Sequence, residues 1–313
     1  MMQIEKNNKS NLKNTDKVPM IVISVDDGAY DSYTNIFPML KKAGIPATFH
    51  IVTEYILNNP HNKYNNRNDN AFQSWCKERG LFRPPMTLEQ VREIAADPLC
   101  EISAHTSDHT NEWNSICKGR EDLLQIFDGD SVNSESTLIG FASPGSLLSR
   151  DDFLKMEDAL RKQGFVYART ALRIKKVKIL RVISRKISRV LHSSYLYAFA
   201  YRDTLLDEQD TFALNAVPVM HDIRLNQIKA IVRLAERKQE NCILLIHSVM
   251  KPGEQLYDDN WSWDINKFKK LIDFLKQEQL DGKIRVVKMK ELATVHNEFN
   301  MRTGEQEKNQ NIV

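Results

Sequence analysis

Two adjacent carboxylates, Asp26 and Asp27, end an apolar run and precede a glycine in the stretch MIVISVDDG. A continuous β-branched run such as Ile21–Val25 is typical of a strand that is covered on both faces. Burying two neighbouring Asp side chains costs free energy unless a metal, another cation or a proton relieves their repulsion. The stretch therefore predicts a charged functional site, with ordinary turn chemistry at Asp27-Gly28 as the alternative interpretation.

A second group that could do chemistry is the pair His105 and His109 in the stretch AHTSDHTN. The four-residue spacing can bring both imidazoles to one side, within reach of a single ion. Two histidines and one carboxylate leave coordination positions open for water and substrate, as a catalytic metal requires. Nitrogen and oxygen ligands suit a divalent metal, with zinc expected and iron, cobalt or manganese as alternatives. An exposed polar turn is the alternative interpretation of the histidine pair.

Short apolar strands alternate with helical patterns along most of the chain. Seven or eight such βα units without a sequence repeat favour a closed or nearly closed parallel barrel in a single domain. An open doubly wound sheet is less favoured, because no glycine-rich phosphate loop follows the first strand. The expected strands span residues 21–25, 47–53, 99–106, 138–143, 165–170, 212–219, 242–249 and 284–289.

In a barrel of this kind the active site gathers at the carboxyl ends of the strands. Asp26 and His105 lie at two such ends, and His247 lies in the strand 242–249. Another strand, 212–219, runs into His221-Asp222. Acidic and imidazole groups thus recur at one end of several strands, which supports both the barrel and a functional site at that end.

The motifs SVDDG, HTSDH and LLIH occur in the order and spacing of the polysaccharide deacetylase family. The chain resembles this family, of the chitooligosaccharide deacetylase or NodB-homology type, over about residues 20 to 295. The resemblance implies a distorted (β/α)7-type barrel and a metal-dependent hydrolase that removes an acetyl group, in the first place N-acetyl, from a saccharide. It implies Asp27, His105 and His109 as metal ligands, Asp26 as general base and His247 as general acid. A histidine satisfied in the core is the alternative interpretation of His247.

The third motif, FASPGS, departs from the family pattern, because Ala142 stands where the family has Arg and Gly145 where it has Tyr. The chain resembles a branch with a Phe-Ala-x-Pro motif followed by Ala-Arg-Thr. We therefore expect Arg169 to supply the charge that holds Asp26, with a salt bridge at the barrel end as the alternative. Backbone N–H groups near Pro144 and Gly145 are expected to contact substrate, since an oxyanion donor needs no side chain.

The fourth motif of the family has no clear counterpart, and VPVMHDIR is nearest by position. His221 and Asp222 are therefore expected to orient the acid or to contact the sugar. A capped helix start, with Asp222 near its N-terminus, is the alternative.

The domain organisation expected from composition is one barrel domain, 19–296, between polar tails at 1–18 and 297–313. Two insertions interrupt the barrel, a polar loop at 54–86 and a basic segment at 171–205. Because long loops at strand ends commonly surround binding sites, 54–86 is expected to frame the substrate cleft.

The basic insertion carries nine Lys, Arg and His residues and no acid over 171–199. A basic amphipathic stretch can lie on an anionic membrane surface. We expect 171–191 to contact such a surface or a phosphate-bearing glycolipid, or alternatively to form a solvated helix over a barrel end.

The remaining composition narrows the class of protein. The net charge of +3 identifies no partner, and nothing in the chain is typical of nucleic-acid base recognition. The four cysteines lack metal-ribbon spacing, and Cys100 and Cys242 are expected in the core. No secretion signal or long apolar run is evident, so a cytoplasmic location is expected, with a peripheral position at the inner membrane as the alternative that a membrane contact of 171–191 implies.

Two other functions fit parts of the pattern. The first is a glycan-binding relative that has lost the reaction, motivated by Ala142 and the missing fourth motif. The second is an iron oxygenase with two histidines and one carboxylate, although such sites belong mostly to other folds.

Overall fold

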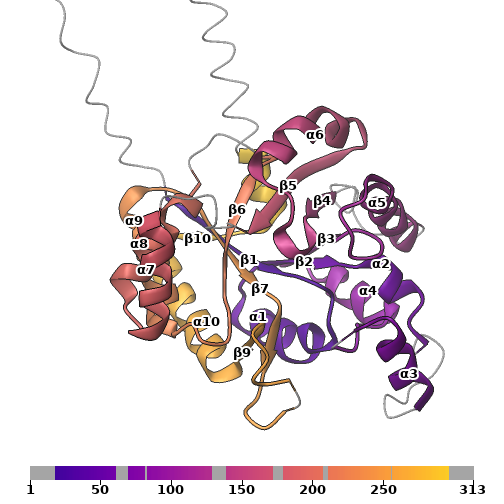
Figure 1. The fold of residues 1–313 in the computed structure, drawn as a ribbon, viewed down its shortest axis with the longest axis horizontal. Coiled ribbons are helices and arrows are strands. Elements are labelled where there is room, and N and C mark those ends of the chain that lie inside the picture. Colours follow the sequence, from indigo (N-terminus) through magenta and orange to yellow (C-terminus); the bar gives the residue numbers. More distant parts are fainter. Residues whose placement is uncertain are drawn as a thin grey trace, which may run out of the picture.

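The chain folds as a barrel of parallel strands surrounded by helices (Figure 1). In this computed structural model the described residues are 18–60, 70–81, 83–128, 139–171, 179–206, 211–254 and 256–295. Residues 1–17 of the predicted tail 1–18 and all of the predicted tail 297–313 lie outside them, as do parts of the predicted insertions.

Seven parallel strands follow one another around the barrel in sequence order. The ring closes because β7 pairs with β1, from Ile21 opposite Cys242 to Val25 opposite Ile246. The predicted closed parallel barrel is therefore confirmed. The strands are β1 (Met20–Val25), β2 (Ala47–Ile51), β3 (Cys100–Ala104), β4 (Ile139–Ala142), β5 (Phe165–Ala171), β6 (Leu214–Pro218) and β7 (Cys242–Ile246).

An eighth strand, β10 (Arg285–Val286), joins the sheet at the amino end of β1. It pairs with the start of β1, whereas β2 pairs with the end of β1 at Ser24 and Val25. Since β7 occupies one edge of β1, β10 and β2 share the other. The strand predicted at 284–289 is thus only two residues long and lies outside the seven-strand ring.

Alternation along the strands separates two cores. In β1, Ile21, Ile23 and Val25 belong to the large cluster that includes the buried faces of the surrounding helices. Val22 belongs to a smaller cluster with residues of β5, β6 and β7 that face the barrel interior. The interior of the barrel is therefore filled with side chains. Asp26 lies an even number of positions after Val22, so it also faces the interior, at the carboxyl end of β1.

Helices cover the outside of the barrel, and their ends follow the signals in the sequence (Figure 1). Thr87 and Gln90 form a capping box, Ser149 and Asp152 form another, and Gly44 ends a helix with φ 70°. The helices are α1 (Phe37–Ala43), α2 (Thr53–Leu57), α3 (Asn70–Glu78), α4 (Leu88–Ala96), α5 (Trp113–Phe127), α6 (Arg150–Lys162), α7 (Ile179–Val190), α8 (Ser194–Tyr201), α9 (Leu225–Lys238) and α10 (Ile265–Leu280), with a π-helix, η1 (Ser32–Ile36), before α1.

The predicted polar loop at 54–86 is not only a loop, because it contains most of α2 and all of α3. The buried Ile56 anchors α2 against the core. Residues 61–69 lie outside the described part of the chain. In the basic insertion, the described residues after 178 form α7 and α8.

Cys100 and Cys242 are buried with free thiols, as predicted. No helix among the described residues is long and apolar enough to cross a lipid bilayer.

Candidate metal and catalytic site

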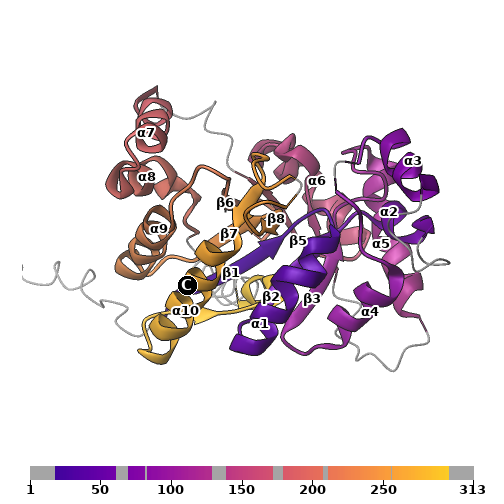
Figure 2. The same ribbon diagram turned by 90° about the horizontal axis from the view of Figure 1, so that it is seen from below.

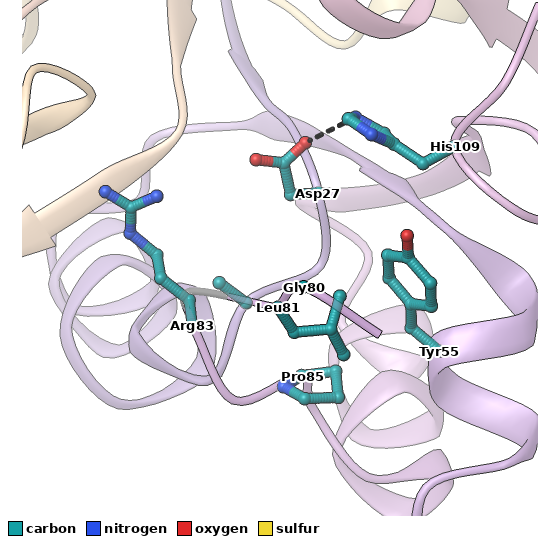
Figure 3. Close-up of a pocket in the computed structure, with 8 residues that line it drawn as sticks. Asp27, Tyr55, Gly80, Leu81, Arg83, Pro85 and His109 are labelled. Atoms are coloured by element: carbon teal, nitrogen blue, oxygen red, sulfur yellow. Dashed lines mark ion pairs between the residues drawn. The ribbon is translucent and has the colours of Figure 1, made fainter. Parts of the chain in front are cut away.

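Three side chains with metal-ligating atoms converge at the carboxyl end of the barrel. The Oδ1 atom of Asp27 lies 3.3 Å from Nε2 of His105 and 3.4 Å from Nε2 of His109. Figure 3 shows the contact between Asp27 and His109. One ligand atom from each residue falls within 4.8 Å of the others, a separation that one ion can bridge.

The backbone at this site is held in an unfavourable conformation. Asp27, Thr106 and His109 have φ values of 74°, 67° and 65°. Left-handed backbone is uncommon for residues with side chains, and such strain concentrates at functional sites. The turns after β1 and β3 thereby aim Asp27, His105 and His109 at one point.

The hydrogen bond of His105 suits a metal ligand. Its Nδ1 lies 2.9 Å from the carbonyl oxygen of Ala142, an acceptor, so Nδ1 carries the proton. Nε2 then presents its lone pair towards Asp27, an arrangement common to histidines that bind metals. The donor set therefore fits a divalent metal, and Ala142 contributes through its backbone.

Asp26 is buried beneath the ligand cluster and is held by a cation. Arg169, also buried, donates a hydrogen bond to its Oδ1 atom, and Nδ1 of His50 lies 3.5 Å from the same oxygen. Its Oδ2 atom lies 4.0 Å from Nε2 of His105. Burial acts to raise the pKa of Asp26, but Arg169 and the nearby histidines lower it to about 2. Asp26 is therefore a carboxylate at neutral pH.

His247 follows β7 and faces both carboxylates. Its ring packs on Trp261, with centroids 4.3 Å apart and planes inclined by 42°. Burial lowers the pKa of His247, whereas Asp27 and Asp26 act to raise it. Burial has the larger effect, so the pKa of His247 lies below its usual value.

Two buried residues of the segment after Asp27 fix the chain that follows His247. Asp31 accepts hydrogen bonds from Ser248 Oγ at 2.7 Å and from the backbone N–H of Val249 at 2.9 Å. Asn35 donates to the carbonyl oxygen of Val249 at 2.7 Å. Neither residue was predicted from the sequence, because nothing in their spacing indicates a contact more than 200 positions away.

A cavity of about 210 Å³ opens beside the ligand cluster (Figure 3). Asp27 and His109 form one side, and Tyr55, Leu81 and Arg83 from the 54–86 insertion form another. Arg83 pairs with Asp259 and donates to Ser262 Oγ at 3.1 Å. The insertion therefore borders the site, at the position where the sequence analysis expected a substrate cleft.

The Pro144-Gly145 segment lies beside the turn that carries His109. Asn111 donates to the carbonyl oxygen of Pro144 at 3.0 Å and accepts from Ser143 Oγ at 2.8 Å. Gly145 is exposed with φ 57°. Asn111 ties the third motif to the metal-ligand turn, a role that the sequence analysis did not foresee.

The other two predicted substrate-binding residues make their contacts elsewhere. Asp222 pairs with Arg189 of α7. The ring of His221 packs edge-on against Tyr257 at 5.5 Å, and its Nε2 lies 3.9 Å from Asp258. These contacts attach the end of β6 to α7 and to the loop before β9 (Ser262–Asp264), rather than to the ligand cluster.

Comparison with known proteins gives a family match over the first part of the chain. Residues 13–125 match the family described as polysaccharide deacetylase. This span contains Asp26, Asp27, His105 and His109, whereas Arg169 and His247 lie beyond it. A search of curated protein sequences found no match.

Solved structures show distant likeness only. The similarity to IcaB from Ammonifex degensii has 20% identity and a TM-score of 0.33, over 48% of this chain and 58% of that one. The BpsB deacetylase domain from Bordetella bronchiseptica has 17% identity and a TM-score of 0.33, over 48% of this chain and 62% of that one. The chain thus spans less than two thirds of either protein. A Mycobacterium smegmatis structure described as a polysaccharide deacetylase has 10% identity and a TM-score of 0.48, over 91% of this chain and 92% of that one. With TM-scores below 0.5, the fold assignment rests on the strand order and register above.

Proposed function

We propose, from the match of residues 13–125 to the polysaccharide deacetylase family, that this chain is a metal-dependent hydrolase that removes an acetyl group from a saccharide. The N-acetyl group is the preferred substrate group in this proposal. The observation that supports it best is the arrangement of the two adjacent carboxylates. Asp27 faces two histidine Nε2 atoms at 3.3 and 3.4 Å, while Asp26 is paired with Arg169.

Asp27, His105 and His109 would hold the metal, with zinc as the expected ion. When bound, a divalent cation supplies Lewis acidity, which polarises an acetyl carbonyl and lowers the pKa of water. With the ion bound, each of the two adjacent carboxylates would have a cation as its partner. The ion would neutralise Asp27, and Arg169 already neutralises Asp26.

Asp26 is proposed as the general base. Because its pKa is about 2, it stays ionised and can accept a proton from the attacking water at neutral pH. Arg169 holds the carboxylate in place, so it is a positioning residue. His247 is proposed as the general acid that gives a proton to the departing amine or alkoxide.

The backbone around Pro144 and Gly145 is proposed to lie against the acetyl group, because Asn111 holds this segment beside the His109 turn. The contacts of His221 and Asp222 support a structural role for both rather than sugar binding.

A glycan-binding protein without activity is the main rival. A binding protein has no need of a buried carboxylate paired with a buried arginine, and such pairs are costly to desolvate. The Asp26–Arg169 pair therefore favours an enzyme. The experiment below separates the two.

The test measures bound metal and released acetate on the same preparation. The full chain is loaded with zinc, its metal content is determined by mass spectrometry, and acetate release is assayed on N-acetylglucosamine oligomers, peptidoglycan fragments and O-acetylated xylan. Wild type should bind one ion per chain and release acetate. The variant His105→Ala/His109→Ala should do neither, whereas His192→Ala, an exposed histidine on another helix connection, should behave as wild type.

Absence of bound metal in wild type would contradict the ligand assignment. Metal binding without acetate release on any of these substrates would favour the glycan-binding rival. In that case the Asp26→Asn variant should bind the same oligosaccharides as wild type.

A further inference from the structure

Helix α7 turns its apolar side chains towards solvent. Six large apolar residues on α7 and its last turn are exposed by 40 to 77%. Their spacing of three, four and seven positions places them along one side of the helix. They are Ile179, Leu180, Ile183, Ile187, Val190 and Leu191.

The opposite side of α7 carries polar groups that bind the protein. Arg181 pairs with Asp203, and Arg189 pairs with Asp222. Gln227 of α9 donates to the carbonyl oxygen of the buried Ser188 at 2.8 Å. These contacts fix the rotation of α7 about its axis, so the outward apolar side is built into the fold.

This arrangement reverses the usual one, in which a surface helix buries its apolar side. Nearly half of the large hydrophobic side chains that are exposed in the described residues lie between 179 and 195. A concentrated apolar surface of this kind marks an interaction site more often than scattered exposed residues do.

The charge around α7 indicates the chemistry of the partner. Between Asp158 and Asp203 the sequence contains no acidic residue. The exposed Lys186 lies next to the apolar row, and the exposed His192 follows it. A second copy of the chain would bring two faces that each carry the exposed Lys186 together, which is unfavourable, whereas an anionic surface would attract Lys186.

The position of α7 indicates the shape of the partner. Helices α9, α8 and α7 form successive layers, because α8 contacts both of the others, and Figure 2 shows α7 as the outermost. A protruding helix with an apolar row and a basic border matches the helices that lie in the plane of a bilayer surface. We propose that α7 docks the protein on an anionic lipid bilayer, with its apolar row among the acyl chains and Lys186 at the headgroups.

The test is co-sedimentation of the full chain with vesicles of phosphatidylcholine alone or mixed with phosphatidylglycerol. Wild type should bind the anionic vesicles more strongly, and added salt should weaken the binding. Leu180→Ser/Ile187→Ser should lower partitioning of the protein onto the vesicles at least about tenfold, because two apolar side chains no longer enter the lipid. The matched control Leu154→Ser/Leu280→Ser, which changes exposed leucines on α6 and α10, should leave binding unchanged.

A charge variant tests whether Lys186 contacts the anionic headgroups. Lys186→Glu should weaken binding to the anionic vesicles by about fivefold or more and leave binding to neutral vesicles unchanged. Thermal unfolding followed by circular dichroism should match wild type for all variants, because the substituted side chains are exposed.

Equal binding to neutral and anionic vesicles, or no binding to either, overturns the proposal. So does a wild-type dimer in sedimentation velocity that Leu180→Ser/Ile187→Ser converts to monomer without any effect on lipid binding. That result would assign the apolar row to a contact between two copies of the chain.

Discussion

Arg169, on β5, donates a hydrogen bond to Asp26, at the end of β1, and both side chains are buried in the barrel interior. In the strand register Arg169 lies directly opposite Ala142 on β4. The positive charge that the family pattern places at the Ala142 position is therefore supplied by the neighbouring strand at the same level of the barrel. The cation beside Asp26 thus comes from β5, the strand next to the one that carries Ala142.

Arg169→Met should lower kcat/KM for acetate release by about 10² to 10³, the usual range for losing one electrostatic contact in an active site. Without the guanidinium, burial raises the pKa of Asp26 above its present value of about 2. The acidic limb of the pH profile should therefore move to higher pH. Steady-state kinetics between pH 4 and 8 measure both effects.

The controls for this prediction are stability measurements on the single variant and on a double variant that also removes the carboxylate. Arg169→Met leaves a buried unpaired carboxylate and should cost about 3 to 5 kcal/mol of stability in urea unfolding. Asp26→Asn/Arg169→Met should recover part of that stability without recovering activity. A Met variant with unchanged pH profile would contradict the role of Arg169 as the positioning residue for Asp26.

Tyr167→Phe should destabilise the protein, because the Tyr167 hydroxyl belongs to a buried polar network inside the barrel. The Tyr167 hydroxyl donates to Glu101 Oε1 at 2.8 Å and lies 3.0 Å from Nε2 of His50. The ring fits only because Gly140 has no side chain, since a Cβ there would stand 1.9 Å from Cζ of Tyr167. Removing the hydroxyl leaves buried partners unsatisfied and should lower the free energy of unfolding by about 1 to 3 kcal/mol.

Urea unfolding of the Phe variant measures this loss. Tyr195→Phe is the control, because Tyr195 is 78% exposed and its substitution should change stability by less than about 0.5 kcal/mol. Equal stability of the two variants would mean that water or repacking replaces the Tyr167 hydroxyl.

The barrel and the ligand cluster were predictable because both depend on local patterns. Apolar strands such as Ile21–Val25 and the spacing of His105 and His109 are visible in a few consecutive residues. The family resemblance then assigned Asp26 and Asp27 different roles, which composition could not do. The expectation that Arg169 would lie near Asp26 required the family resemblance, which puts a cation at the Ala142 position, and the assumption that β4 and β5 are neighbours.

Features that depend on distant contacts were not predictable. Asp31 and Asn35 meet the chain after β7, and no local pattern encodes that contact. The amphipathicity of α7 was evident, but amphipathicity does not say which side faces the protein. That choice depends on ion pairs with Asp203 and Asp222, which lie in later elements. His221 and Asp222 were assigned by position alone, without a motif to support them.

Asp31→Asn should remove a pH dependence of stability. Burial raises the pKa of Asp31 to about 6, against hydrogen bonds from Ser248 and Val249 that lower it. The folded state thus binds a proton that the unfolded state, with a pKa near 3.8, has released. Stability from this group is complete below about pH 3.8 and is lost as pH rises through about 6.

The difference in unfolding free energy between wild type and Asp31→Asn should therefore change by at most about 3 kcal/mol between pH 4 and 7. Wild type should lose stability relative to the variant as pH rises. Urea unfolding at closely spaced pH values measures this slope. Asp273→Asn, an exposed position on α10, should run parallel to wild type. A flat difference for Asp31→Asn would show that Asp31 is ionised throughout this range.

Trp261→Ala should move the basic limb of the activity profile to higher pH. The indole packs on the ring of His247 at 4.3 Å, and burial is the largest cause of the lowered pKa of that histidine. With the indole removed, water reaches the imidazole, and its pKa rises towards the usual 6.5. Because the proposed acid must carry a proton, the enzyme should stay active at higher pH. Trp261→Phe keeps an aromatic cover and should shift less, and His247→Gln should abolish the basic limb. An unshifted limb in Trp261→Ala would mean that a group other than His247 delivers the proton.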